Sequence, residues 1–285
     1  MGLRSRLKLS TGGLNNNYYE DLCGDCEKEV GGLKIMICGK GGTGKSVISV
    51  LMARILSRKY NVYLIDSDES NTLLPEMLGA PQPKPLVEYL GGRGSVFKRG
   101  EVNIVRALSK AGRGVVLKNL PDQYVSKSPE GIGLIVIGKV RNYSEGCACP
   151  LNYLTRTLLK HLVLDEDEVV LVVTDAGIEH IGRGVEEGSD AVLAVVDPTA
   201  ESLSLAKTLK EQIKPLKKKF WLVLNKATPE VADIIIEKAK GMGLEVNGVI
   251  GFDEKIFKSC LEGGVLKAEK SMSQVENVLK AINLL

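Results

Sequence analysis

The sequence has no apolar run that approaches the ~18–20 residues of a membrane-spanning helix. The formal net charge is only +3 over 285 residues, and the basic residues are dispersed. Arg4, Arg6 and Lys8 lie near the N-terminus, but no apolar segment follows them, as a secretory signal would require. These absences argue against a membrane span, against nucleic acid as the main partner and against export. We therefore expect a cytoplasmic protein.

The composition is that of a chain with ample material for a core, since 44% of it is hydrophobic and 26% charged. We expect an N-terminal extension over residues 1–31 and one domain over residues 32–285. Within that domain apolar, strand-like runs alternate with helical patterns, which predicts an α/β fold with a mostly parallel, doubly wound sheet. Residues 81–132 are the least regular part. Their prolines at 81, 83 and 85 argue against a long helix.

The stretch from Cys38 to Ser46 has the spacing G-x-x-x-x-G-K-S. An apolar run precedes it and a helical pattern follows it, which is the context of a phosphate-binding loop. Its glycines let backbone N–H groups face phosphate oxygens, and the following helix adds its positive end. Lys45 is expected to reach the β- and γ-phosphates of a nucleotide, and Ser46 to bind Mg²⁺. The expected nucleotide-binding residues of this loop are Gly39, Lys40, Gly41, Gly42, Thr43, Gly44, Lys45 and Ser46.

Acidic residues follow the next expected strand, residues 62–65, directly. Asp66 and Asp68 would lie beside the phosphates, because ligands of open α/β sheets bind at the carboxyl ends of the strands. Asp66 is interpreted as a support of the loop, and capping of the following turn is the alternative for the pair. A third acid, Asp175, follows the expected strand 169–173.

The sequence has six cysteines, and they fit a reducing compartment and a role in metal binding better than they fit disulfide bonds. Cys23 and Cys26 form a C-x-x-C pair, which is half of a metal site, although a redox pair or incidental thiols remain alternatives. Cys38 and Cys260 are interpreted as buried small side chains.

A second thiol pair, Cys147 and Cys149, precedes the expected helix 151–162. Two thiolates do not complete a soft-metal site, but two copies related by a twofold axis would supply four. A reactive or structural dithiol is the alternative. The candidate metal ligands are therefore Cys147 and Cys149 from each of two protomers.

The form G-K-G-G-T-G-K-S, with its second lysine Lys40, resembles the deviant Walker motif of the MinD/ParA/nitrogenase-iron-protein class of P-loop ATPases. The resemblance implies a nucleotide-dependent homodimer in which Lys40 reaches the partner's nucleotide. It also implies that Asp68 orients the attacking water, so that Lys40, Lys45 and Asp68 form the catalytic set. Asn225, with Lys226 beside it, corresponds to the residue that reads the adenine edge.

The run from Gly146 to Arg156, G-C-x-C-P-x-x-x-L-x-R, and the later A-G-I-E-H-x-x-R resemble the CooC-type ATPases. That resemblance implies an ATP-dependent metallochaperone that binds nickel, or zinc, at the shared C-x-C site and delivers it to carbon monoxide dehydrogenase. The chain departs from the pattern at Val173, where the Walker B aspartate is expected. Asp175 is then the residue expected to serve Mg²⁺ together with Ser46 and Asp68.

Two other functions remain open at this point. The same four thiolates would hold a bridging iron–sulfur cluster in a MinD/Mrp-like ATPase. A polymerising or membrane-bound positioning ATPase is disfavoured, because residues 275–285 are short and have no strong basic face. The sequence does not distinguish nickel, zinc and copper(I).

Overall fold

The computed structural model describes residues 32–109, 114–139, 149–177 and 182–285. In these residues eight strands form one sheet, in the order β3-β4-β2-β5-β1-β6-β7-β8. Neighbouring strands are parallel, except that β3 runs antiparallel to β4 at one edge. The strands are β1 (Leu33–Cys38), β2 (Asn61–Asp66), β3 (Ser126–Lys127), β4 (Gly133–Val136), β5 (Glu168–Val173), β6 (Ala191–Val196), β7 (Lys219–Ala227) and β8 (Gly248–Gly251).

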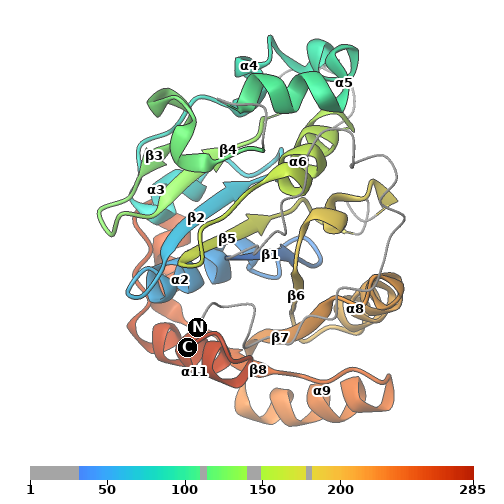
Figure 1. The fold of residues 1–285 in the computed structure, drawn as a ribbon. Coiled ribbons are helices and arrows are strands. Elements are labelled where there is room, and N and C mark those ends of the chain that lie inside the picture. The colour runs from blue at the N-terminus through green and yellow to red at the C-terminus, as the bar shows by residue number, and fades with distance from the viewer. Residues whose placement is uncertain (1–31, 110–113, 140–148, 178–181) are drawn as a thin grey trace.

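Helices connect the strands and lie on both faces of the sheet (Figure 1). They are α2 (Lys45–Leu56), α3 (Leu74–Leu78), α4 (Leu86–Tyr89), α5 (Arg93–Leu108), α6 (Cys149–His161), α8 (Ala200–Ile213), α9 (Pro229–Gly241), α10 (Glu254–Glu262) and α11 (Glu269–Ala281).

The sheet separates two hydrophobic cores, because side chains of a strand alternate between its faces. On β1, Ile35 and Ile37 join the core beneath α2 and α11, whereas Met36 and Cys38 join the core beneath α6 and α8. Every residue of β1 is buried, as expected of a central parallel strand covered on both sides. The α/β, doubly wound architecture expected from the sequence is thus confirmed.

The order of the strands places a topological switch at β1. The chain leaves β1 toward β2 on one side, while β6 pairs with β1 on the other. Ligands of open α/β sheets bind at such a point, outside the carboxyl ends of the strands. The loop after β1 and the acids after β2 therefore belong to one region of the molecule.

Helix α5, which lies in the irregular region 81–132, begins only after the three prolines. It consists of two helical segments on either side of Gly100, whose φ of 67° is not helical, so neither segment is long. Strand β8, at the other edge of the sheet, covers only Gly248–Gly251. In the described residues no helix is both long enough and apolar enough to cross a membrane.

Candidate functional site

The loop after β1 is built around glycines that no other residue can replace without displacement. Gly39 has φ of 145°, and a Cβ there would lie 2.2 Å from the carbonyl oxygen of Val195. Gly44 precedes α2 with φ of 95°, and a Cβ there would lie 2.4 Å from Nδ2 of Asn225. Both contacts are shorter than a carbon atom tolerates. The glycines thus let the loop backbone pack directly against β6 and the end of β7.

Two lysines leave this loop in different directions. Nζ of Lys45 is buried and donates to the carbonyl oxygens of Gly39 at 3.2 Å and Lys40 at 3.3 Å. Burial lowers the pKa of Lys45, against the opposing effect of Asp68 and other nearby negative groups. Nζ of Lys40 is more exposed and pairs with Oε2 of Glu201 at 2.5 Å, a contact that raises the pKa of Lys40. One lysine thus faces the interior of the loop, and the other faces outward.

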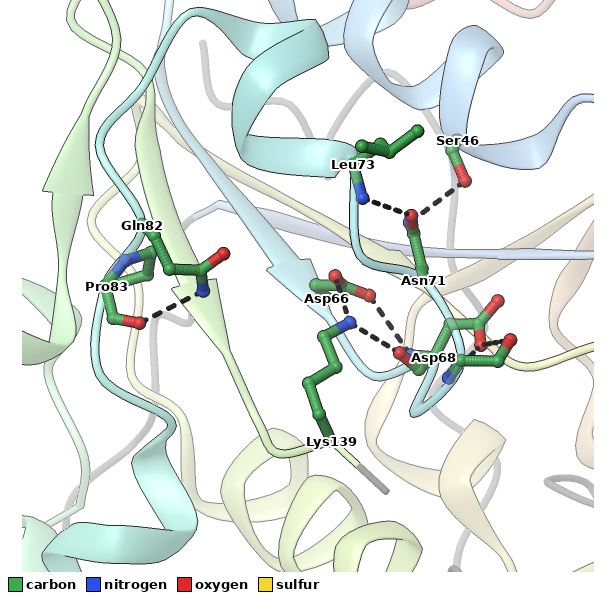
Figure 2. Close-up of polar contacts among 9 residues, drawn as sticks. Ser46, Asp66, Asp68, Asn71, Leu73, Gln82, Pro83 and Lys139 are labelled. Atoms are coloured by element: carbon green, nitrogen blue, oxygen red, sulfur yellow. Dashed lines mark hydrogen bonds and ion pairs between the residues drawn. The ribbon is translucent and has the colours of Figure 1, made fainter. Parts of the chain in front are cut away.

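The acids after β2 occupy distinct positions. Asp68 lines a cavity beside the phosphate-binding loop. Its Oδ1 accepts hydrogen bonds from N and Oγ of Ser70 at 2.9 and 2.6 Å. Asn71 continues this turn, and its Nδ2 donates to Oγ of Ser46 at 3.1 Å. Figure 2 shows Asn71 between Ser46 and Leu73. The turn after β2 is therefore linked directly to the hydroxyl at the start of α2.

Asp66 is fully buried behind Asp68 and has a cationic partner that sequence reasoning missed. Nζ of Lys139 donates to Oδ2 of Asp66 and to the carbonyl oxygen of Asp68, both at 2.6 Å (Figure 2). Burial raises the pKa of Asp66 to about 6, although the nearby Lys139 ammonium opposes the shift. The expected role of Asp66 as a support of the loop agrees with this position. Lys139 follows β4, the neighbour of β2 in the sheet. Its position after the carboxyl end of a strand is the sequence feature that could have indicated a place near the site.

The end of β5 places its acid two residues beyond the strand. Val173 is fully buried, and pairs with Ile37 of β1 and with Asp66 of β2. Asp175 lies close enough to Lys45 for its negative charge to oppose the lowering of that lysine's pKa by burial. The N–H of Gly177 then donates to the carbonyl oxygen of Gly39 at 3.3 Å. The segment after β5 is thus held against the phosphate-binding loop.

A cavity of about 370 Å³ opens above the loop. Asn225 and Lys226 form one wall, and both donate to the loop: Nδ2 of Asn225 to the carbonyl oxygen of Thr43, and Nζ of Lys226 to that of Gly42, each at 2.7 Å. The cavity is lined by residues of the loop, by Asp68 and Ser70, by Ala176 and by residues of β8 and α10. The glycines of the loop lie on its polar side, and residues of α10 belong to its apolar wall.

The apolar wall consists of aromatic and aliphatic side chains around the start of α10, and it includes Phe252, which follows the last strand and is expected from the sequence to stack near a base. Phe252 and Phe257 lie with ring centroids 6.0 Å apart, and Ile256 adds to the same wall. Cys260 lines the cavity and is only partly buried, so its interpretation as a buried core residue was wrong. Cys38 is fully buried as expected, and burial raises the pKa of its thiol to about 12.

Of the expected thiol ligands, Cys149 is described and begins α6. Cys147, together with the C-x-x-C pair Cys23 and Cys26 and the whole N-terminal extension, lies outside the described residues. Within the described ranges no three His, Cys, Asp or Glu side chains form a metal-binding group. Helix α6 approaches the nucleotide side of the sheet, since Oγ1 of Thr155 lies 2.7 Å from Oγ of Ser67.

The chemistry of the site suits a magnesium nucleotide. The hydroxyl of Ser46 and the carboxylates of Asp68 and Asp175 are hard oxygen donors, the type that Mg²⁺ prefers while it keeps several waters and phosphate oxygens. Lys45 and the N-terminus of α2 supply positive charge at the same place. The cavity above them is large enough for a base, with an apolar wall on one side.

Comparison with known proteins gives consistent results. Residues 34–266 match the family of CobQ/CobB/MinD/ParA nucleotide binding domains. An uncharacterized ATP-binding protein of Methanocaldococcus jannaschii, MJ0084, is 41% identical over 252 residues, which are 88% of this chain and 99% of that protein. The carbon monoxide dehydrogenase accessory protein CooC of Rhodospirillum rubrum is 33% identical over 233 residues, 79% of this chain and 85% of CooC.

Among solved structures, the septum site-determining protein MinD of Pyrococcus horikoshii OT3, complexed with Mg-ADP, superimposes with a TM-score of 0.62. It is 17% identical and covers 88% of this chain and 96% of its own, a likeness of fold. The match to the family, over residues 34–266, runs from β1 to beyond α10. It therefore includes the phosphate-binding loop, the acidic turns after β2 and β5, and the residues that line the cavity. The chain therefore belongs to the CobQ/CobB/MinD/ParA family of P-loop nucleotide-binding ATPases.

Proposed function

We propose that this ATPase carries a soft divalent metal ion, with nickel as the leading candidate, and delivers it to carbon monoxide dehydrogenase. The observation that carries the proposal is the C-x-C-P sequence at the start of α6 in a chain that is 33% identical to CooC. The metal is cargo in this scheme. The thiolates of Cys147 and Cys149 from two protomers would hold it, because two thiolates alone leave the coordination half filled.

In the proposed hydrolytic site, the loop residues Gly39 to Ser46 bind the phosphates through backbone N–H groups, with Lys45 beside them. Asn225 and Lys226 form the side of the cavity nearest the base, and the apolar wall at Phe252 receives its face. Magnesium, held by Ser46, Asp68 and Asp175, would neutralise phosphate charge when bound.

Catalysis in this proposal consists of positioning and charge stabilisation. Asp68 orients the attacking water from the edge of the cavity. Lys40 acts at the nucleotide of the partner subunit in a homodimer, and it must leave Glu201 to do so. Binding of ATP would thus bring two protomers together and complete the four-thiolate site, and hydrolysis would loosen it.

Metal analysis of anaerobically purified protein tests the proposal. We expect one nickel or zinc ion per dimer, a shift toward dimer on metal addition, and loss of binding in Cys147→Ser and Cys149→Ser. Cys260→Ser is the matched control, since this thiol lies at the cavity far along the chain from the C-x-C pair. One ion per monomer without dimerisation, or binding that survives in the double serine variant, would overturn the bridging site.

The same preparation separates the alternative function. A bridging iron–sulfur cluster on the same thiolates would give a brown protein with charge-transfer absorption and equimolar iron and sulfide. Iron and sulfide analysis decides between the two, because a nickel tetrathiolate site is also coloured: protein that binds nickel or zinc and contains neither iron nor sulfide supports the metallochaperone.

A further inference from the structure

The turn after β2, residues 66–68, is contacted by two residues, Lys139 and Thr155, that flank the segment 140–148, which lies outside the described residues. That segment connects β4 to α6, and Lys139 lies directly before it, where β4 has just ended. The ammonium of Lys139 bridges the carboxylate of Asp66 and the backbone carbonyl of Asp68, at 2.6 Å each (Figure 2). The lysine and aspartate side chains are 6% and 0% exposed. The chain just after β4 is thus anchored on the turn at Lys139.

Helix α6, which follows residues 140–148 in the chain, makes a separate contact with the same turn. Thr155 lies on α6, six residues after Cys149, and its Oγ1 is 2.7 Å from Oγ of Ser67. Thr155 also donates to the carbonyl oxygen of Leu151 within the helix at 3.0 Å, and both hydroxyl-bearing residues are buried. The start of α6 and the turn therefore share a hydrogen-bond network that solvent does not enter.

Buried polar contacts of this kind resist independent movement of their partners. A buried charge or hydroxyl that loses its partner has no water to replace it, and the cost of an unsatisfied group exceeds the gain of an ordinary hydrogen bond. A displacement of Asp66, Ser67 or Asp68 therefore favours a matching displacement of Lys139 and α6.

The outer side of the turn belongs to the nucleotide site. Asp68 lines the cavity, and Asn71, three residues further, donates to Oγ of Ser46 at the start of α2. A change in the occupant of the phosphate-binding loop thus acts on one side of the turn, while Lys139 and Thr155 of α6 contact its other side.

We propose that residues 66–68 couple the nucleotide site to Cys149 at the start of α6, with Lys139 and Thr155 as the positioning residues that transmit the change. This inference deepens the proposed function, since it names the route by which nucleotide state reaches the thiols. The coupling acts in both directions: a ligand on the thiols alters nucleotide affinity by the same factor by which the nucleotide alters the affinity for that ligand.

The test measures the rate at which iodoacetamide alkylates the thiol of Cys149, by mass spectrometry of the full chain, without added metal. Rates are compared between protein bound to Mg-ADP and protein bound to a non-hydrolysable Mg-ATP analogue. For the wild type we expect the two rates to differ by about fivefold or more, the lower end of ordinary coupling energies. In Lys139→Met and in Thr155→Val the ratio should fall toward one, although both nucleotides still bind.

Several controls isolate the coupling from loss of structure. Lys118→Met removes another lysine–aspartate pair, formed with Asp165 at the surface, and should keep the wild-type ratio. Cys38 is fully buried, so its alkylation reports unfolding. Because the ATP analogue is expected to favour the dimer, sedimentation checks that each variant has the same dimer content as the wild type with the same nucleotide. If Lys139→Met fails to fold, the double variant Lys139→Met/Asp66→Asn removes both charges, and Thr155→Val removes no charge at all.

A wild-type ratio near one would overturn the coupling, as would a wild-type ratio retained in both Lys139→Met and Thr155→Val. Because no metal is added, these results are independent of the cargo. Failure of metal binding at Cys147 and Cys149 would instead remove the proposed function and leave the measured coupling of the turn to Cys149 in place.

Discussion

Removal of the Lys139 ammonium should destabilise the fold by an amount that grows with pH. Asp66 is fully buried, and burial raises its folded-state pKa from 3.8 to about 6 despite the neighbouring ammonium. A carboxyl whose pKa is raised on folding contributes stability that is fully present below about pH 4 and is lost as the pH passes about 6. Over two pKa units this titration is worth about 3 kcal/mol.

In the variant Lys139→Met the free energy of unfolding should depend more strongly on pH. Without the ammonium, the pKa of Asp66 rises further, so the variant keeps the proton to higher pH than the wild type does. At about pH 5 the carboxyl is largely protonated in both proteins, and we expect a difference in unfolding free energy of only about 1 kcal/mol. At about pH 8 the wild type has a buried ion pair, whereas the variant has an unpaired carboxyl, and the difference should reach about 3 kcal/mol.

Urea denaturation at the two pH values, followed by circular dichroism, measures both differences. The double variant Lys139→Met/Asp66→Asn should recover most of the loss at high pH, because it leaves no unpaired buried charge. A difference that stays constant between the two pH values, or a double variant no more stable than the single one, would refute the reasoning.

Three further predictions concern the phosphate-binding loop. Lys40→Ala and Lys45→Ala should each abolish most ATP hydrolysis, but a mixture should regain one competent site per mixed dimer; no recovery in confirmed mixed dimers would exclude action of Lys40 in trans. Glu201→Gln releases Lys40 from an exposed ion pair and should raise turnover by up to about fivefold, so a lowered rate would show that Glu201 assists hydrolysis. Gly44→Ala should weaken nucleotide binding by about tenfold or more, since φ of 95° and the contact with Asn225 both oppose a side chain; unchanged affinity in a fluorescent-nucleotide titration would contradict this.

The sequence was sufficient for the fold and for the backbone of the site, for a physical reason. Glycine spacing and strand ends are local properties, and the parallel sheet brings the ends of β1, β2 and β5 together without further information. The loop at Gly39 to Ser46 and the acid Asp68 therefore lie where their positions in the sequence placed them.

Contacts across long sequence separations could not be predicted in the same way. Lys139 is 73 residues from Asp66, and a lysine that follows a strand ordinarily remains in water. Cys260 lines the cavity only because α10 packs near the loop, and the break at Gly100 became visible only with the backbone angles. In each case the side chain's surroundings, rather than its own pattern, determine its role.

The pairing of Asp66 with Lys139 also bears on which acids are available to a cation when position 173 is valine. Val173 is buried in the strand between β1 and β2, so it presents nothing to the cavity. Asp66 is turned away from the cavity and neutralised by Lys139, so it offers no free charge there. Asp68 lies at the cavity, and Asp175 lies near enough to Lys45 to affect its pKa. These two carboxylates are therefore the ones we propose for a cation in place of the absent acid, and the pairing with Lys139 keeps the third carboxylate from competing for it.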